Sequence, residues 1–433
     1  MQRAGVIRSP LLSESSFMKQ DLFIRNIGEL VLVPRGPVHG AAMGSVSVIE
    51  NACLRVRDGK IEQFGTSMDM FAAESEPVVD ACGGCVIPGL IDCHTHTVFA
   101  GTREGEFVRR IEGASYVEIA EEGGGIRTSV ASVRGASEEE LVELALPRLS
   151  RMLQRGVTTV EIKSGYGLTI DDEVKMLRAA RSAGERVPLD VVGTYLAAHT
   201  IPAEFDGRPD AYLDLVLDEE ILASLTRDGL AEFCDVFCER SAFDVARSKR
   251  VLTACAAHGL RGKVHADQIT QMGASRLAAE VGAISADHLE EIDDGGLQAM
   301  RDAGVIAVLL PACSFFLGVG QAPARKILDA GLAVALATDF NPGSAMVESL
   351  PLAMGIGVTQ MRMTPTEVLV AVTANAAAAL GREDRVGAIE VGMQADLVIL
   401  DVPNHKRMMY EMGRDTARTV IKKGEVVYER ETC

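Results

Sequence analysis

The middle of this chain switches repeatedly between short apolar runs of strand length and longer stretches with helical periodicity. Eight apolar runs occupy residues 85–94, 156–165, 189–199, 233–240, 261–268, 283–290, 304–313 and 331–340. Intervening stretches such as 137–156, 169–184 and 243–259 repeat apolar residues every three or four positions, and several end in glycine. Eight strands alternating with helices predict an α/β protein built on a parallel (β/α)8 TIM barrel. A doubly wound open sheet is the alternative, but no G-x-G-x-x-G follows the first strand.

The two ends of the chain have a different pattern of apolar and polar residues. From about Asp21 to Val86, and again from about Val386, apolar and polar residues alternate with period two and are interrupted by turns such as Asp58-Gly59. We expect these segments to pair into one small β-sandwich domain. The expected domains are therefore a composite β domain, residues 1–87 with 386–433, and a barrel, residues 88–385.

The charge and composition of the chain argue against nucleic acid and membranes as binding partners. Lysine and arginine total 43 against 61 acidic residues, and 43 − 61 = −18, so the chain has no electrostatic footprint for nucleic acid or an anionic membrane surface. No apolar run approaches the roughly 18 to 20 residues that span a bilayer, and the first residues lack a signal-peptide pattern. The nine cysteines are odd in number, and the pair Cys82 and Cys85 has no second pair to complete a zinc site. We expect a cytoplasmic enzyme with a small-molecule substrate.

Polar residues follow the predicted strands where each strand ends. Five of the eight histidines lie there, and the eighth strand ends in an aspartate; these are His94, His96, His199, His265, His288 and Asp339. Reactive groups of TIM barrels lie at the C-terminal ends of the strands. His94 and His96 are two residues apart on one strand, so their rings point the same way. With His265 and Asp339 they form the ligand set of a catalytic zinc or a similar ion, whereas each residue taken alone has a plain structural explanation.

Several motifs then reveal a resemblance. GLIDCHTHTVFAGTRE and VGAIEVGMQADLVILD resemble signatures of the amidohydrolase superfamily. EIKSGYGL, GTYLAAHTIP, VHADQ, SADHLE and ATDFNPGS resemble, more closely, the imidazolonepropionase family, in the same order from about Leu32 to Val427. The resemblance implies hydrolysis of the cyclic amide C–N bond of 4-imidazolone-5-propanoate to N-formimidoyl-L-glutamate by a metal-bound hydroxide. It also implies one zinc or iron ion per subunit and, at the level of the family, a homodimer.

The resemblance and the chemistry of the reaction together assign roles to single residues. Asp339 would ligate the ion, take a proton from the water and pass it to the leaving ring nitrogen. His288 would donate to the developing oxyanion, or else orient His265 or Asp339. The residues expected to contact substrate are Arg103, Tyr166, His199, Gln268, Asn341, Gly343 and Ser344.

The substrate's propionate needs a cation in this acidic chain. The resemblance assigns this role to Arg103, whose fork suits a carboxylate. Its plain alternative is a loop arginine paired with Glu104 or Glu106. Arg109, Arg110 and Arg127 are further cations of the same region. The run Gly123–Gly125 is interpreted as a lid over the site, with an ordinary surface loop as the alternative.

Two departures from the superfamily pattern bear on the mechanism. The fourth strand ends in DVFCER without the lysine of two-metal members, which indicates a single ion, and Lys163 is interpreted as part of a structural or substrate-side ion pair. Gln268 occupies a position where some members have a glutamate that shuttles protons, and it is assigned to a hydrogen bond with the ring edge of the substrate. The alternatives are a mononuclear aminohydrolase of a purine or pyrimidine, which would need that glutamate, or an inactive scaffold, which would be expected to lose metal ligands.

Overall fold

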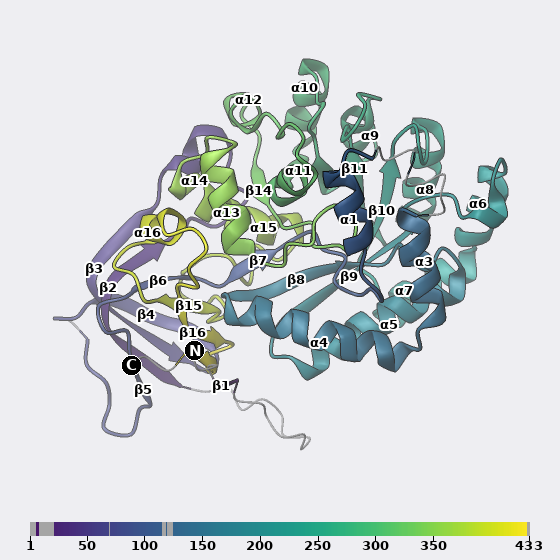
Figure 1. Cartoon of the computed structure of the whole chain (residues 1–433). Coiled ribbons are helices and arrows are strands. Elements are labelled where there is room, and N and C mark those ends of the chain that lie inside the picture. Colours follow the sequence, from purple (N-terminus) through teal and green to yellow (C-terminus); the bar gives the residue numbers. More distant parts are fainter. Residues whose placement is uncertain (1–5, 8–20, 69, 115–117, 119–123, 431–433) are drawn as a thin grey trace.

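The computed structural model describes residues 6–7, 21–68, 70–114, 118 and 124–430, and it places a barrel beside a separate sheet (Figure 1). The barrel contains eight parallel strands in sequence order around the ring. They are β7 (Leu90–Asp92), β8 (Val157–Lys163), β9 (Asp190–Ala198), β10 (Phe233–Cys238), β11 (Arg261–Ala266), β12 (Ser285–His288), β13 (Ile306–Leu309) and β14 (Val334–Leu336). Each predicted apolar run contains one of them, so the predicted TIM barrel is confirmed.

The first and last strands meet just beyond their C-terminal ends. Thr95 forms a parallel bridge with Phe340, the N–H of Asp339 donates to the carbonyl of His94 at 3.0 Å, and that of His96 donates to the carbonyl of Phe340 at 2.9 Å. The barrel is therefore closed at its C-terminal rim by the segments that carry three of the predicted metal ligands.

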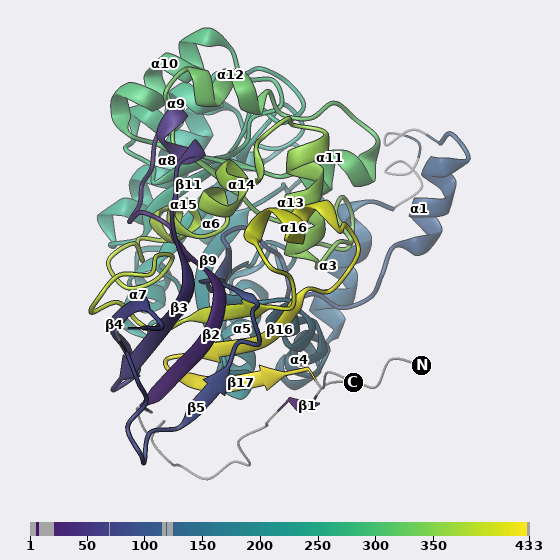
Figure 2. The same cartoon turned by 90° about the vertical axis from the view of Figure 1, so that its left-hand side faces the viewer.

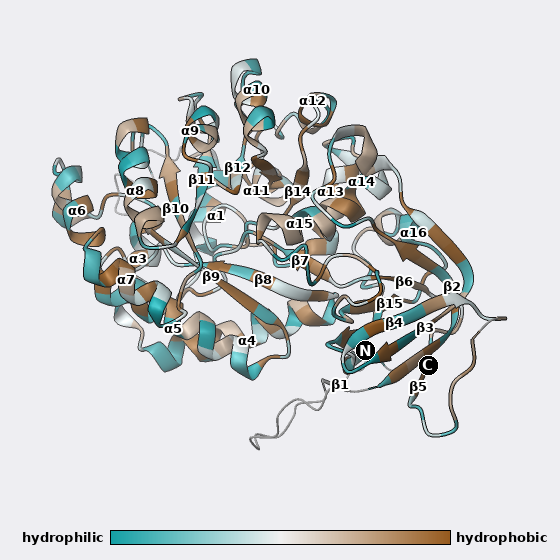
Figure 3. Ribbon diagram, turned by 180° about the vertical axis from the view of Figure 1, so that it is seen from behind, coloured by the Kyte–Doolittle hydropathy of each residue, from teal (hydrophilic) through white to brown (hydrophobic). Residues whose placement is uncertain are grey.

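Helices surround the strands because the strands bury both faces and need an outer layer. The helices are α1 (Glu104–Ile111), α3 (Ile126–Gly135), α4 (Glu138–Gln154), α5 (Ile170–Arg186), α6 (Pro209–Val216), α7 (Glu219–Arg227), α8 (Val245–Ala257), α9 (Ala274–Glu280), α10 (Asp294–Ala303), α11 (Pro311–Leu317), α12 (Ala324–Asp329), α13 (Leu350–Thr359), α14 (Pro365–Ala371) and α15 (Ala374–Ala379). Figure 3 shows helices such as α5, α7 and α8 alternating between hydrophilic and hydrophobic residues. The three helical stretches named from periodicity are α4, α5 and α8, and each begins at a side-chain N-cap: Ser137, Thr169 and Asp244.

The second sheet combines both ends of the chain (Figure 2). Its strands run in the order β1-β17-β16-β15-β6-β2-β3-β4, with β5 beside β2. They are β1 (Val6–Ile7), β2 (Leu22–Leu32), β3 (Ser47–Arg57), β4 (Lys60–Thr66), β5 (Val78–Asp80), β6 (Cys85–Pro88), β15 (Leu397–Leu400), β16 (Ala417–Lys422) and β17 (Glu425–Glu429). Asp58 and Gly59, with φ of 52° and 73°, form the predicted tight turn between β3 and β4. Two short 3-10 helices (Gly40–Gly44, Ala203–Phe205) and α16 (His405–Tyr410) complete the described elements.

A buried lysine joins this sheet to the barrel. Nζ of Lys422, at the end of β16, donates to the carbonyl of Thr158 at 2.9 Å and to carboxylate oxygens of Asp190 and Asp396, both at 2.7 Å. Thr158 and Asp190 belong to β8 and β9, so the contacts cross the junction. We call Lys422, Asp190 and Asp396 the lysine anchor.

The described cysteines are all free thiols, and seven of these eight are buried. Cys82 (φ 50°) and Gly83 (φ 75°) form a turn that leads into β6, which supports the turn interpretation of the Cys82 and Cys85 pair. Across the part of the chain that the structure describes, no helix combines the length and the apolar character needed to cross a membrane.

Candidate metal centre and active site

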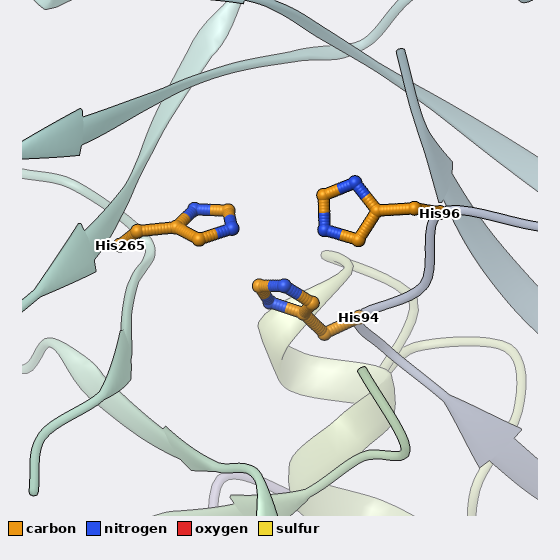
Figure 4. Close-up of side chains that lie close together, drawn as sticks. All are labelled: His94, His96 and His265. Carbon is orange, nitrogen blue, oxygen red and sulfur yellow. The ribbon is translucent and has the colours of Figure 1, made fainter. Parts of the chain in front are cut away.

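Three histidines converge at the C-terminal rim of the barrel. His94 and His96 follow β7, and His265 lies in β11; their exposed fractions are 0%, 2% and 3%. One nitrogen from each ring can be chosen so that all three lie within 4.8 Å of one another. Figure 4 shows the rings pointing toward a common space between the strands. The alternation of side chains along the first strand brings the two HxH imidazoles to one side, as its spacing indicates.

The predicted carboxylate lies beside these rings. Oδ1 of Asp339 is 3.5 Å from Nε2 of His94 and 3.5 Å from Nε2 of His96. Asp339 has φ of 54°, a left-handed backbone conformation that is costly for a residue with a Cβ and is found at functional sites. The structure therefore brings together the four residues that the sequence marked as metal ligands.

The donor atoms of this group fit a divalent ion. Nε2 of His94 and Nε2 of His265 are buried and have no hydrogen-bond partner. The opposite nitrogen of His94, Nδ1, lies 2.6 Å from Oδ2 of Asp287, and Nδ1 of His265 lies 3.0 Å from Oδ2 of Asp235. Metal-binding histidines commonly face a carboxylate with one nitrogen and the ion with the other. The residues present therefore match a site for one zinc-like ion.

A layer of buried charges lies under the histidines. Its members, which we call the charge layer, are fully buried residues of the strands β8, β10, β11 and β12: Glu161, Lys163, Asp235, Lys263 and Asp287. Nζ of Lys163 donates to Glu161 at 2.9 Å and to Asp235 at 2.8 Å. Nζ of Lys263 donates to the other oxygen of Glu161 at 3.1 Å. Lys163 is thus part of a structural ion pair, one of the two interpretations left open by the sequence.

Sequence reasoning missed the other four members of this layer. A usable signal existed, because Lys263 stands two residues before His265 within a predicted barrel strand, and Asp287 stands between Ala286 and His288. A charged side chain inside a buried parallel strand must find a partner.

The pKa values reflect this electrostatic field. Burial and the Lys163 charge oppose protonation of His94, but the neighbouring carboxylates of Asp287 and Asp339 outweigh them and raise its pKa to about 9. Burial lowers the pKa of His265 to about 4 in spite of Asp235. Burial disfavours the Asp339 anion, yet the two neighbouring histidines hold its pKa well below the usual range. The carboxylates on both sides of His94 therefore favour a positive charge there, which a bound cation would supply.

One wall of the site is aromatic. His199, directly after β9, stacks on His96 with ring centroids 5.3 Å apart and an interplanar angle of 15°. Its Nδ1 lies 3.0 Å from the carbonyl of Gly165, and burial, with the neighbouring His96 and His265, keeps its pKa well below the usual range. Tyr166 is buried, with its ring centroid 5.7 Å from that of His96. Both predicted substrate contacts thus lie beside His96, a predicted metal ligand.

The loop after the eighth strand, residues 339–344, is stabilised by hydrogen bonds between its own residues. Oδ1 of Asn341 accepts from the N–H groups of Gly343 and Ser344, and its Nδ2 donates to the carbonyl of Asp339 at 2.6 Å. Oγ of Ser344 lies 3.5 Å from Oδ2 of Asp339. Both polar atoms of the Asn341 amide are therefore engaged within the loop that carries Asp339.

Two arginines lie against this loop. Arg103 donates through Nε and Nη2 to one oxygen of Glu106, at 2.8 and 2.7 Å. A Cβ added at Gly343 would lie 2.2 Å from Nη1 of Arg103, so glycine permits this approach. Arg110 donates to the carbonyl of Gly343 at 3.3 Å and lies over the ring of Phe316. Arg103 thus has the Glu106 partner of its plain alternative and also reaches the site loop.

The remaining predicted residues lie at the fifth and sixth strands. His288 ends β12, with its ring centroid 5.3 Å from that of His265, and it can contribute a nitrogen within 4.8 Å of His94 and Asp339. Gln268 is half-buried, with Nε2 3.9 Å from Sγ of Cys313. Gly123, the first residue of the expected lid, lies outside the described residues.

Comparison with known proteins adds independent findings. A model of the amidohydrolase family matches residues 85–427 of this chain. An imidazolonepropionase from Geobacillus sp. (strain WCH70) is 49% identical over 415 residues, which cover 94% of this chain and 97% of the relative. The match therefore extends over nearly the whole of both proteins.

Solved structures show the same fold at much lower identity. Triazine hydrolase from Arthobacter aurescens superposes with a TM-score of 0.75 at 19% identity, covering 95% of this chain and 96% of that one. An adenosine deaminase from Xanthomonas campestris with bound zinc gives a TM-score of 0.69 at 19% identity, covering 94% and 92%. At such identity the likeness concerns the architecture alone.

Proposed function

This chain belongs to the imidazolonepropionase family of the amidohydrolases, and from that premise we propose that it opens the ring of 4-imidazolone-5-propanoate to give N-formimidoyl-L-glutamate. The water-dependent step breaks the cyclic amide C–N bond. The observation that carries the proposal is the convergence of His94, His96, His265 and Asp339 at the barrel rim, in a chain 49% identical to an imidazolonepropionase over nearly its full length.

The amidohydrolases depend on metal ions, and we assign one zinc or iron ion per subunit to these four residues. When bound, such an ion supplies a water whose pKa is lowered to about 7 and polarises the attacked carbonyl. A single ion is favoured because the inward-facing Asp235 of β10 is already paired with Lys163 and His265, and β10 carries no lysine.

Asp339 is assigned the movement of the proton. Its Oδ1 faces the two histidines, and its Oδ2 lies on the side of Ser344. Its lowered pKa keeps it ionised and able to accept a proton from the attacking water. The same carboxyl group then delivers that proton to the ring nitrogen as the C–N bond breaks.

The other polar groups orient the substrate. His288 is assigned as the donor to the oxygen of the attacked carbonyl, where negative charge develops. Gln268 hydrogen-bonds the ring edge, and Tyr166 and His199 line the site beside His96. Asn341, Gly343 and Ser344 shape the loop against which the substrate lies, and Ser344 offers its hydroxyl.

The propionate is assigned to the arginine side of the loop. Arg103 is the proposed ligand, and Arg110 adds a second positive charge next to Gly343. Because Glu106 already accepts from Arg103, the added charge of Arg110 helps to offset the acidic background of the chain. Replacing Arg103 by Met should raise KM more than it lowers kcat, since the propionate is remote from the reacting bond.

The test combines metal analysis with the ultraviolet absorbance of the substrate. We expect about one equivalent of zinc or iron per subunit and loss of imidazolone propionate absorbance. Chelation should abolish turnover, and Asp339→Asn should reduce kcat by about 10²- to 10⁴-fold. Turnover of guanine or cytosine with imidazolone propionate untouched would instead support an aminohydrolase, and a metal-free protein without either activity would support the inactive scaffold.

We also propose the domain division 1–87 with 386–433 and 88–385, and a cytoplasmic homodimer. The free thiols of the eight described cysteines support a reducing compartment. Sedimentation of the purified chain tests the subunit number.

A further inference from the structure

The loop between β8 and α5 lies on the first turn of α5 and carries Tyr166. We call residues 164–168 the tyrosine loop. Leu168 has φ of 54°, a left-handed conformation that is costly for a leucine. A Cβ added at Gly167 would lie 2.6 Å from the backbone nitrogen of Glu173, so glycine lets the loop approach the helix closely. The loop is therefore built against α5.

A buried carboxylate holds the N–H groups of the tyrosine loop. Oε2 of Glu173 accepts from the N–H of Gly165 at 2.8 Å. Its Oε1 accepts from the N–H groups of Gly167 and Leu168 at 2.8 and 2.7 Å. Glu173 is fully buried, and burial raises its pKa, an effect that the hydrogen bonds from Ser164 and the loop N–H groups oppose. Both carboxylate oxygens are therefore engaged by this one loop.

An arginine holds carbonyl groups of the same loop. Nε of Arg134, in α3, donates to the carbonyl of Gly167 at 2.7 Å, and its Nη2 donates to that of Leu168 at 3.3 Å. The same Nη2 donates to Oε1 of Glu204 at 2.7 Å, in the loop after β9. Arg134 therefore ties the tyrosine loop to the loop that carries His199.

The tyrosine loop also contacts the aromatic wall of the site. The ring centroid of Tyr166 lies 5.7 Å from that of His96 and 5.5 Å from that of His199. The carbonyl of Gly165 lies 3.0 Å from Nδ1 of His199, and a Cβ added at Gly165 would lie 2.9 Å from that nitrogen. A displacement of the loop would therefore move Tyr166 and His199 together.

We propose that Glu173 and Arg134 are positioning residues that hold Tyr166 and His199 in place for the substrate. They act through the backbone of the tyrosine loop, since the carboxylate fixes three N–H groups and the guanidinium two carbonyls. A loop that is ordered in advance binds the substrate without a further entropic cost. This inference rests on the proposed function, in which Tyr166 and His199 line the site.

The experiment compares Glu173→Gln with Glu367→Gln. Glu367 is a matched control, because it is also buried and its Oε2 accepts from the N–H of Thr364 and from Nη1 of Arg325, both at 2.7 Å, at the start of α14. Both variants should lower the urea midpoint of unfolding, since each loses hydrogen bonds to a buried carboxylate. Only Glu173→Gln should raise KM for imidazolone propionate, by about 10-fold, with kcat within about threefold of wild type. Its metal content should match wild type.

Arg134→Met decides the question even if Glu173→Gln does not fold. The Arg134 side chain is 29% exposed, so the freed carbonyls can bind water and KM should rise less, by about threefold. Glu173→Asp, which keeps the charge, should recover part of the lost affinity. An unchanged KM in Arg134→Met would overturn the proposal, and so would a KM in folded Glu173→Gln equal to that of Glu367→Gln.

A second readout does not depend on turnover. In protein labelled with 3-fluorotyrosine, the 19F resonance of Tyr166 is identified by its absence in Tyr166→Phe. It should shift or broaden in Glu173→Gln and Arg134→Met and stay in place in Glu367→Gln; an unchanged resonance in the first two variants would overturn the proposal. If wild type fails to hydrolyse imidazolone propionate, the proposed function fails, while the 19F spectrum still decides whether these residues position Tyr166.

Discussion

The molecule contains two clusters built around buried lysines, the lysine anchor and the charge layer, and they differ in whether their outermost polar atoms have partners. In the lysine anchor, Lys422 donates to three oxygens, which are the carbonyl of Thr158 and one carboxylate oxygen each of Asp190 and Asp396. In the charge layer, Lys163 is equally well paired, but the network continues upward into His94 and His265. The latter two rings end in nitrogens without partners.

This difference separates a structural use of buried charge from a functional one. A buried ionic cluster whose polar atoms are all paired ties segments together and offers nothing to a ligand. A cluster that orients histidines whose other nitrogens are buried and have no hydrogen-bond partner leaves those nitrogens available to bind a cation. Buried lysines and aspartates therefore join the sheet to the barrel in the lysine anchor, whereas in the charge layer they orient the histidines of the proposed metal site.

The largest expected effect comes from removing either lysine. Lys163→Met removes the charge shared by Glu161 and Asp235 and leaves Glu161 with Lys263 alone, so it should lower the free energy of unfolding by about 3–5 kcal/mol. Lys422→Met should cost about 3 kcal/mol, since Asp190 is 39% exposed and can be rehydrated. Urea denaturation of both variants measures the loss.

Metal content distinguishes the two variants. Protein folded in the presence of excess zinc and then dialysed should retain the ion in Lys422→Met and lose part of it in Lys163→Met. Equal zinc retention in both variants would contradict the distinction between the two clusters.

A smaller effect is expected one step above the charge layer. Asp287→Asn removes the charge next to Nδ1 of His94 and should weaken zinc binding by about 10- to 100-fold. Competition with a chromophoric chelator measures the affinity. Asp396→Asn, in the lysine anchor, is the matched control and should bind zinc as wild type does.

The smallest effect concerns pH. Burial opposes ionisation of Asp190, but the charge and hydrogen bond of Lys422, with Lys423, lower its pKa to about 2. An acid whose pKa is lowered by folding stabilises the protein above its unfolded pKa of about 3.9, and this stabilisation is lost as the pH falls toward 2.

We therefore expect the unfolding free energy of wild type to fall more steeply between pH 5 and 3.5 than that of Asp190→Asn. Urea titrations at several pH values measure the slopes. Parallel slopes would show that Asp190 contributes no pH-dependent stability to the lysine anchor.

The barrel was predictable because its signal is repeated. Eight apolar runs separated by amphipathic stretches leave few alternatives, and the polar residue at the end of each run marks the rim. His94, His96, His265 and Asp339 could be grouped for this reason, although the first and last lie far apart in the sequence. Strand order converts distant positions into neighbours.

The partners of these residues were harder to foresee. Lys263 and Asp287 contact residues of other strands, and their pairing depends on the stagger of neighbouring strands, which local periodicity does not encode. The contacts of Glu173 depend on a left-handed backbone at Leu168 that sequence does not announce, because leucine rarely adopts that conformation. The engagement of Asn341 within its own loop was likewise invisible, since asparagine is common in turns of every kind.

The closure of the barrel at its rim also bears on biosynthesis. During translation His94 and His96 are synthesised long before Asp339. The backbone hydrogen bonds between residues 94–96 and 339–340 can form only when both segments are present. A nascent chain exposes an incomplete chelating pair until the eighth strand has emerged. We therefore expect the proposed ion to be acquired only after the eighth strand has emerged, and a prematurely terminated translation product would carry His94 and His96 without Asp339.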